Sequence, residues 1–191
     1  AESEDVSAPL AGGPYTAAGG GALYASFTVS FDTLPGGTGG YFAHFKDAAT
    51  DFPGFRARVF ASTVNATAGL FRLGIGNSST ANANSGQIAT DLSLGVAYNV
   101  VTRYDVGAGL SSIWLNPAAE SDPRVDASDS TTTIDVTAFA FRQSTASGNG
   151  MGGLVVDNLR VGTTFVDVVP EPATWALLVL GLGGFLLARR R

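Results

Sequence analysis

The chain has 191 residues, of which 45% are hydrophobic and none is cysteine. A chain of this size can bury one substantial core, and the lack of cysteine excludes disulfide frameworks, thiol nucleophiles and cysteine metal sites. Asp and Glu outnumber Lys and Arg by 16 to 11, which argues against nucleic acid as a partner, because nucleic-acid binding needs a basic surface.

Residues 1–21 begin acidic and then become rich in Gly, Ala and Pro. This composition predicts a flexible lead-in or an edge segment. The chain begins at Ala1 without a basic and apolar leader, so we expect that an export signal has been removed or lies outside this sequence.

The next residues alternate between apolar and polar side chains from 23 to 32, which is the period of a half-buried strand. Further strands are predicted at 41–46, 55–60, 70–75, 98–105, 112–115, 134–142 and 154–161. Arg56 and Arg58 are expected on the solvent face of their strand, and the Gly-rich segment 106–109 is expected to close a hairpin. Short strands, polar loops and no amphipathic helix before the C-terminal tail predict an all-β, two-sheet antiparallel sandwich spanning 22–168.

Three segments of this sandwich resemble a known architecture. Residues 94–105 with 113–117, and the closing segment 155–162, are similar to laminin-G-like and concanavalin-A-like jelly rolls. The resemblance implies a two-sheet jelly roll of a kind that binds glycans or matrix proteins, sometimes through calcium. Some relatives of that kind hydrolyse polysaccharides.

The inventory of acids and bases argues against catalysis. Glycosidases of that architecture place two glutamates two residues apart on one strand, whereas Glu120, in a loop, is the only glutamate besides Glu2, Glu4 and Glu171. His44 is the single histidine, and we expect it to be exposed or packed on a strand rather than part of a Ser-His-Asp triad. We therefore expect a protein that is not an enzyme.

Aspartates in two loops are the candidate metal ligands. Asp122, Asp126 and Asp129 crowd one loop, and Asp47 and Asp51 flank another. Hard oxygen ligands in loops are what calcium takes, so calcium is the cofactor that these residues would hold; no other cofactor is expected. Solvated turn aspartates are the alternative interpretation.

Tyr41 and Trp114 are the side chains that we expect to contact a glycan, with core packing as the alternative for each. Tyr24, Tyr98 and Tyr104 are further aromatic candidates in predicted strands. The alternation places some of these rings inward, so the pattern does not select among them.

The last 23 residues carry three signals in order. Val169, Pro170, Glu171 and Pro172 form a rigid turn motif, an uncharged apolar run covers 173–188, and three arginines come after it. An apolar run of this kind predicts a single transmembrane-type helix. Its membrane contacts are expected from Trp175, Leu177, Leu178, Leu180, Phe185, Leu186 and Leu187. Arg189, Arg190 and Arg191 are expected to stay on the cytoplasmic side, which leaves the rest of the chain outside.

This order of motif, helix with interior glycines and arginine cluster resembles the PEP-CTERM sorting signal of Gram-negative bacteria. The resemblance implies that an exosortase-type membrane protease recognises Pro170, Glu171 and Pro172 and removes the helix. The expected partners are this protease, the Sec export machinery, the membrane, and extracellular polysaccharide or envelope. The expected location is an inner-membrane intermediate and then the cell surface or extracellular matrix.

These observations together predict an exported, non-enzymatic protein with a structural or adhesive role. A carbohydrate-binding module that recognises an extracellular polysaccharide is the first alternative. An atypical glycoside hydrolase is the second.

Overall fold

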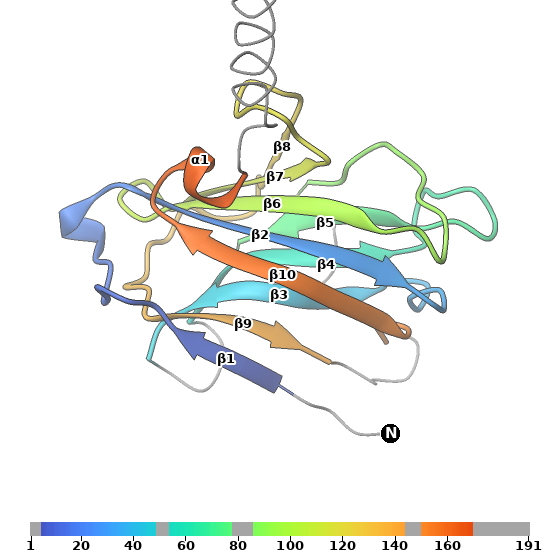
Figure 1. Cartoon of the computed structure of the whole chain (residues 1–191), viewed down its shortest axis with the longest axis horizontal. Helices are drawn as coiled ribbons and strands as arrows, with labels where there is room; N and C mark the ends of the chain where they lie inside the picture. Colours follow the sequence, from blue (N-terminus) through green and yellow to red (C-terminus); the bar gives the residue numbers. More distant parts are fainter. Residues whose placement is uncertain (1–4, 49–53, 78–85, 144–149, 170–191) are drawn as a thin grey trace, which may run out of the picture.

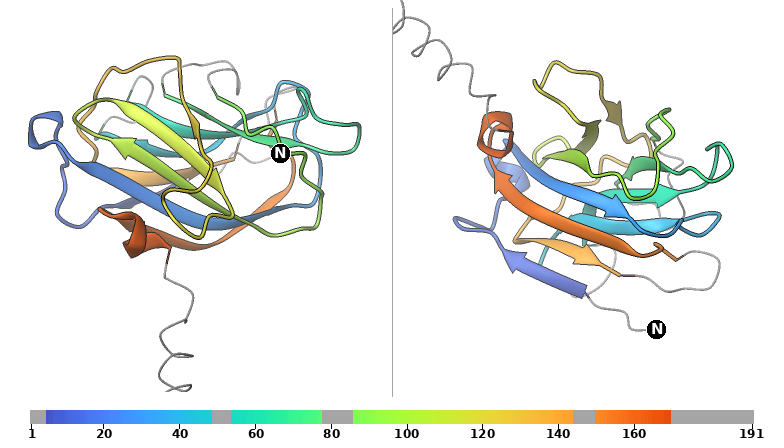
Figure 2. Two further views of the ribbon diagram at one scale, coloured as in Figure 1. Left: turned by 90° about the horizontal axis from the view of Figure 1, so that it is seen from above. Right: turned by 45° about the vertical axis from the view of Figure 1, so that its right-hand side comes forward.

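The fold of the chain is an antiparallel β-sandwich. The computed structural model describes residues 5–48, 54–77, 86–143 and 150–169. Within these residues, two five-stranded sheets have the orders β1-β9-β3-β4-β5 (the first sheet) and β10-β2-β6-β7-β8 (the second sheet), and they lie face to face (Figures 1 and 2). The predicted all-β, two-sheet class is therefore confirmed, and the architecture is that of a jelly-roll sandwich.

The strands are short and mostly match the predicted segments. The first sheet contains β1 (Asp5–Pro9), β3 (Gly40–Lys46), β4 (Phe55–Ser62), β5 (Arg72–Gly76) and β9 (Ala138–Arg142). The second contains β2 (Ala22–Phe31), β6 (Tyr98–Asp105), β7 (Leu110–Leu115), β8 (Val125–Asp126) and β10 (Leu154–Gly162). The helical elements are η1 (Ala17–Gly19) and α1 (Phe165–Val168).

The sequence pattern located the long strands better than the short elements. The predicted hairpin is confirmed by the pairing of β6 with β7, in which Val101 lies opposite Trp114. The N-terminal segment contributes β1, an edge strand that pairs with β9. The alternation did not predict β8 or α1, because two and four residues are too few to show a period.

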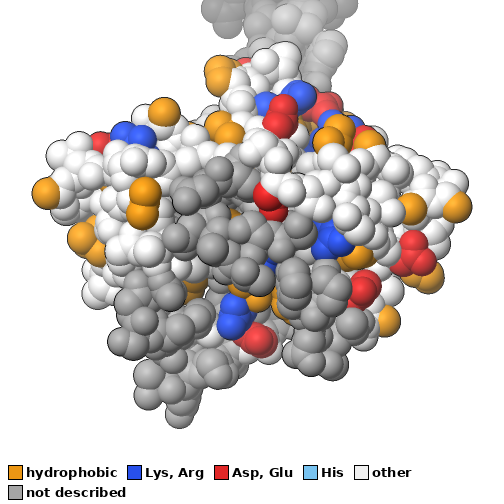
Figure 3. Space-filling model, turned by 180° about the vertical axis from the view of Figure 1, so that it is seen from behind, with side chains coloured by type: hydrophobic (Ala, Val, Ile, Leu, Met, Phe, Trp, Pro, Cys, Tyr) orange, Lys and Arg blue, Asp and Glu red, His pale blue; other side chains and the backbone are white. Residues whose placement is uncertain are grey.

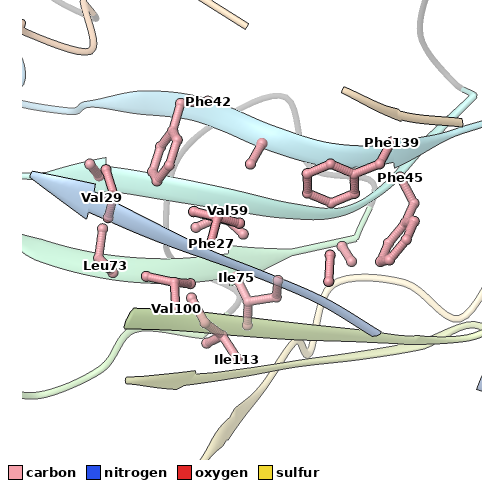
Figure 4. Close-up of a cluster of buried hydrophobic side chains, with 14 of the residues drawn as sticks. Phe27, Val29, Phe42, Phe45, Val59, Leu73, Ile75, Val100, Ile113 and Phe139 are labelled. Carbon is pink, nitrogen blue, oxygen red and sulfur yellow. The ribbon is translucent and has the colours of Figure 1, made fainter. Parts of the chain in front are cut away.

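Alternating apolar residues of both sheets form the core, as Figure 4 shows for a set that includes Phe27, Phe42 and Phe139. The rings of Phe27 and Phe42 meet edge to face with their centroids 5.9 Å apart, and those of Phe45 and Phe139 are 5.0 Å apart. Each of these fully buried rings contributes about 1.5–3 kcal/mol through burial, before the geometry of the aromatic pair is counted. The core therefore ties β2 of one sheet to β3 and β9 of the other.

An irregularity in β3 and β4 changes where the arginines of β4 lie. The register of the two strands shifts between Tyr41 and Phe45, and Ala57 has a positive φ of 49°. Such bulges re-aim side chains. Arg56 and Arg58 are 2% and 1% exposed, so the prediction that both lie on a solvent face is wrong.

The two arginines have different surroundings because of this bulge. Arg56 donates from Nε to the Thr132 carbonyl oxygen at 2.6 Å. The guanidinium of Arg58 lies instead over the ring of Tyr41, with Cζ 5.2 Å from the ring centroid. Arg58 is thereby placed in a cluster of aromatic and basic side chains on the outer side of the first sheet.

Candidate functional site

The main candidate site is this cluster on the outer side of β3, β4 and β9, which we call the Tyr41 cluster. It consists of Tyr41, His44, Lys46, Phe55, Arg58, Phe60 and Arg142. Figure 3 shows the molecule from behind, where a few Lys and Arg side chains are visible with acidic and hydrophobic side chains beside them. None of the seven residues belongs to the core between the sheets.

Tyr41 is the centre of the cluster. Its ring is half-buried and packs against His44, Phe55 and Phe60, with centroid distances of 5.4, 6.3 and 5.8 Å. The guanidinium of Arg142 lies 4.6 Å from the ring centroid, closer than that of Arg58. Two cations within about 6 Å of one ring make favourable cation–π contacts and concentrate positive charge at this face.

His44 is the most perturbed titratable group of the cluster. Its side chain is 3% exposed, and its ring lies 4.2 Å from the ring of Phe55. Burial, with smaller effects from the charges of Arg58, Lys46 and Arg142, lowers the pKa of His44 to about 3. The imidazole is therefore neutral at pH 7.

The sequence pattern named one member of this cluster as a ligand contact and missed the rest. Tyr41 was predicted, whereas Lys46, Arg58 and Arg142 were not. Residues 1–169 contain eight Lys and Arg, and seven of them are spread over six of the eight predicted strands, so their positions in the sequence do not indicate that these three meet. The pairing of β3 with both β4 and β9 brings these cations together.

The other predicted glycan contact has a different surrounding. Trp114 on β7 is fully buried, and its indole nitrogen donates to the Glu120 carbonyl oxygen at 3.3 Å. The ring of Phe165 packs edge to face on it at 5.8 Å. A fully buried ring has no surface for a sugar, so core packing, the alternative interpretation, describes Trp114.

The remaining tyrosines of the predicted strands also have internal roles. Tyr104 is fully buried in the core, Tyr24 is 5% exposed, and the Tyr98 hydroxyl accepts a bond from the Ser93 backbone nitrogen at 2.8 Å. Burial and a hydrogen bond to Glu120 raise the pKa of Tyr24 to about 12. Tyr24 thus remains a hydrogen-bond donor at all physiological pH values.

The three aspartates predicted as calcium ligands have separate partners. Asp122 accepts from the Ala118 and Ala119 backbone nitrogens at 2.7 and 3.0 Å, and Asp126 forms an ion pair with Arg124 at 2.9 Å. Asp129 accepts from the Asn77 backbone nitrogen at 2.8 Å. In the described part of the chain no three His, Cys, Asp or Glu side chains group as metal ligands, and Asp51 lies outside that part. Calcium binding stays a prediction that this arrangement does not favour.

A second functional region begins where β10 ends. Asp167 accepts from the backbone nitrogens of Thr163 and Thr164 at 3.2 and 2.9 Å, which caps the first turn of α1. Phe165 and Val168 then pack on the outer face of the second sheet, and Ser26 Oγ donates to the Val168 carbonyl oxygen at 2.7 Å. The chain is therefore held on the sandwich up to Val169, which is 8% exposed.

The predicted sorting motif, apolar helix and arginine end continue from Val169. Residues 170–191, with the predicted membrane contacts and the Pro170–Pro172 motif, lie outside the described residues. No helix within residues 5–48, 54–77, 86–143 and 150–169 is long and apolar enough to cross a membrane.

Comparison with solved structures gives neighbours of the same general architecture. An alginate lyase from Pseudomonas aeruginosa aligns with a TM-score of 0.49 and 11% identity, over 79% of this chain and 68% of that one. Alginate lyase AlgAT5 of polysaccharide lyase family 7 aligns with a TM-score of 0.47 and 14% identity, over 76% of this chain and 60% of that one. A Trypanosoma rangeli sialidase in complex with sialic acid has a TM-score of 0.45 and 14% identity, over 75% of this chain and 21% of that one.

These likenesses concern the β-sandwich architecture alone, and this chain spans 60% of AlgAT5 and 21% of the sialidase. No curated protein matches the chain. The assignment to laminin-G-like or concanavalin-A-like domains therefore stays a prediction.

Comparison with protein-family models identifies the C-terminal region. Residues 168–191 match the model of the PEP-CTERM protein-sorting motif, as predicted from the Pro-Glu-Pro signature. The match begins at Val168, the last residue of α1, whose side chain is buried. The motif indicates an exported protein that is sorted by exosortase, a membrane protein, and is anchored or processed at the membrane.

Proposed function

We propose that this exported protein is a non-enzymatic polysaccharide binder of the cell surface or extracellular matrix, and that the Tyr41 cluster holds an acidic polysaccharide. The observation that carries the proposal is the gathering of cations on this face, with Arg58 and Arg142 beside the half-buried Tyr41 and Lys46 near His44. Residues 1–169 otherwise carry a net charge of −7, from 15 acidic and eight basic residues. A local excess of cations in an acidic domain favours a ligand with negative charge at this face.

The side chains of the cluster suit a sugar polymer that carries acid groups. A guanidinium binds carboxylate or sulfate through paired, charge-assisted hydrogen bonds. The ring of Tyr41 offers a flat apolar surface with a polar tip, and two torsions suffice to order it. An acidic sugar would therefore contact the exposed part of Tyr41 and place its acid group near Arg142. Repetition of weak contacts along a polymer suits an adhesive or structural role.

The non-enzymatic part of the proposal is supported by what surrounds the two candidate catalytic residues. Glu120 is bonded to the Tyr24 hydroxyl near the second sheet, away from the cluster. The ring nitrogens of His44 have no serine or aspartate as hydrogen-bond partner within the described segments. Neither the paired carboxylates nor the triad that hydrolases need is supported by these residues.

Affinity gel electrophoresis of the full chain in a non-ionic detergent tests the binding. We expect polygalacturonate in the gel to retard the protein, and a highly methyl-esterified form of the same polymer to have little effect. Salt should weaken the retardation, because it screens exposed charges. Arg142→Gln should weaken it as well, while Arg160→Gln, which makes the same charge change at an exposed position of β10, should not. Equal retardation by the acidic and esterified polymers would overturn the proposed charge recognition.

A separate assay tests whether the protein is a hydrolase. Incubation with the same polymers should release no new reducing ends and no unsaturated products. Release by the unaltered protein, abolished in His44→Asn, would show that the protein is an enzyme.

We also propose that the tail is removed near Pro170 and that the sandwich then reaches the cell surface or matrix. The match of residues 168–191 to the sorting motif supports this step. Intact mass of the cell-associated and secreted protein tests it. A secreted species that ends between residues 169 and 173 is expected, and full-length protein confined to the membrane fraction would contradict the cleavage.

A further inference from the structure

A small pocket lies beside the Tyr41 cluster, where β1 covers the edge of β9. Its volume is about 110 Å³, and its lining includes Asp5, Ser7, His44, Lys46, Phe55 and Arg142. Since a water molecule takes about 30 Å³ of liquid volume, the pocket has room for roughly three to four waters. A single charged group such as a carboxylate fits this space, and the sugar ring that carries it would remain outside, near Tyr41.

His44 provides the feature that points to a ligand. Its side chain is only 3% exposed, and its ring lines the pocket. Neither Nδ1 nor Nε2 has a hydrogen-bond partner in the part of the chain that the structure describes. Buried polar atoms in native proteins are nearly always partnered, so the unpartnered imidazole of this lining residue is a candidate partner for an oxygen atom of an occupant.

The charges around the pocket select the sign of that occupant. Of the described residues in the lining, Lys46 and Arg142 contribute two positive charges and Asp5 contributes one negative charge. The guanidinium of Arg58 adds its field at the His44 ring. The excess of positive charge favours an anion, and the neutral imidazole donates one N–H to it.

We propose that this pocket is an anion subsite, in which His44, Lys46 and Arg142 bind one carboxylate or sulfate group. The inference rests on the proposed function in one respect, namely that an acidic polymer on Tyr41 supplies the group. A free small anion offers the same chemistry, and titration with a monomeric and a polymeric acid separates the two sources.

Occupation of the subsite couples ligand binding to protonation of His44. A bound anion favours the imidazolium form, so binding raises the pKa of His44 and the affinity rises as the pH falls. Among the described residues, the groups that face His44 are Asp5 from β1, Tyr41 and Lys46 from β3, Arg58 from β4 and Arg142 from β9. Asp5 is the acidic group of the pocket lining, so Asp5→Asn separates the effect of its charge from the response of His44.

NMR of the imidazole tests the proposal directly, because His44 is the only histidine of the chain. The full chain, labelled at histidine and kept in a non-ionic detergent, is titrated with galacturonate, with polygalacturonate and with neutral galactose. We expect both acidic ligands to shift the His44 signals and to raise its titration midpoint by about one pH unit or more. Galactose should have no effect.

Two variants test whether galacturonate binds at Arg142. Arg142→Gln should weaken the binding of galacturonate about tenfold, because it removes one charge-assisted partner. Arg160→Gln should leave it unchanged. The unaltered protein carries the main readout, so the test does not depend on whether a variant folds.

The outcomes distinguish this subsite from the proposed function. Retardation by polygalacturonate in gels without any response of His44 would leave polymer binding intact and overturn the subsite. A response to galacturonate without retardation by the polymer would support a site for free small anions and overturn the proposed function. No response to either acidic ligand and no retardation would overturn both.

Discussion

The outer faces of the two sheets each carry a tyrosine beside an arginine, but one tyrosine is buried and the other is partly exposed. The second sheet presents Tyr24 with the guanidinium of Arg103 at 5.9 Å, and the first sheet presents Tyr41 with that of Arg142 at 4.6 Å. Tyr24 is 5% exposed because α1 packs over it, with the ring of Phe165 at 6.2 Å, whereas Tyr41 is only half-buried. Within the described residues, α1 thus covers one tyrosine, and the other keeps part of its surface exposed.

The difference comes from the side chains that surround each tyrosine. The residues after β10 turn back as α1 and supply Phe165 and Val168 to the aromatic face of the second sheet. Tyr41 has, besides three rings, two guanidinium groups as neighbours, and a charged group favours contact with water or an anion over an apolar cover. An aromatic side chain on an outer sheet face therefore indicates a binding site only when the rest of the chain leaves it uncovered.

The largest expected effect is on the covered face. Trp114→Ala should lower the free energy of unfolding by about 3–5 kcal/mol, because it leaves a cavity between β7 and α1. Leu110→Ala, in the same strand but with a side chain 48% exposed, should change it by less than about 0.5 kcal/mol. Urea unfolding of the three proteins measures this. Similar losses for both variants would mean that α1 does not cover Trp114 tightly.

The second-largest effect concerns the face that carries Tyr41 and His44, and it appears in the pH dependence of the unfolding free energy. The pKa of His44 is about 3 in the folded protein, below its unfolded value near 6.5. The stability that neutral His44 contributes is therefore complete above pH 6.5 and is lost as the pH falls from 6.5 toward 3. Between pH 6.5 and 5 the unfolding free energy should fall by about 2 kcal/mol from this group. His44→Asn should remove that slope. The carboxylates with lowered pKa values, such as Asp122 and Asp126, act in the same direction but below about pH 4. An unchanged slope in the variant would show that His44 is not buried neutral.

The uncovered tyrosine should affect ligand binding more than stability. Tyr41→Ala should weaken retention by polygalacturonate about tenfold, because it removes the ring that the sugar contacts and against which the two guanidinium groups are placed. Tyr41→Phe keeps the ring and should retain most of the affinity. Affinity gels at several polymer concentrations measure both. Equal losses in the two variants would assign the contact to the hydroxyl rather than to the ring.

The smallest effect is on the attachment of α1. Ser26→Ala removes the hydrogen bond to the Val168 carbonyl oxygen and should lower stability by about 1 kcal/mol. Hydrogen exchange at the Val169 amide, which bonds to the Phe165 carbonyl oxygen at 3.0 Å, should become faster. Ser30→Ala, four residues further along β2, serves as the control. Unchanged exchange in Ser26→Ala would mean that the aromatic contacts alone hold α1.

Much of the fold could be predicted because its signals are local. Strands such as β2 and β6 show their alternation within eight to ten residues, and the sorting motif is a contiguous match at residues 168–191. Elements without a local signal were missed. The four residues of α1 are too short for a helical period, and the bulge at Ala57 has no mark in the sequence that would separate Arg56 from Arg58.

By itself, the sequence determined the β class, the positions of the longer strands and the sorting signal, because each depends on neighbouring residues. The tertiary structure decided which aromatic side chains remain available. Tyr41, Arg58 and Arg142 meet because β3 pairs with β4 on one side and with β9, almost a hundred residues later, on the other. The sequence around Trp114 does not distinguish it from an exposed aromatic residue of a strand. It is buried because α1 folds back onto β7. Which strands pair, and which distant segment packs over a given side chain, depend on the whole chain, and alternation within a strand does not encode them.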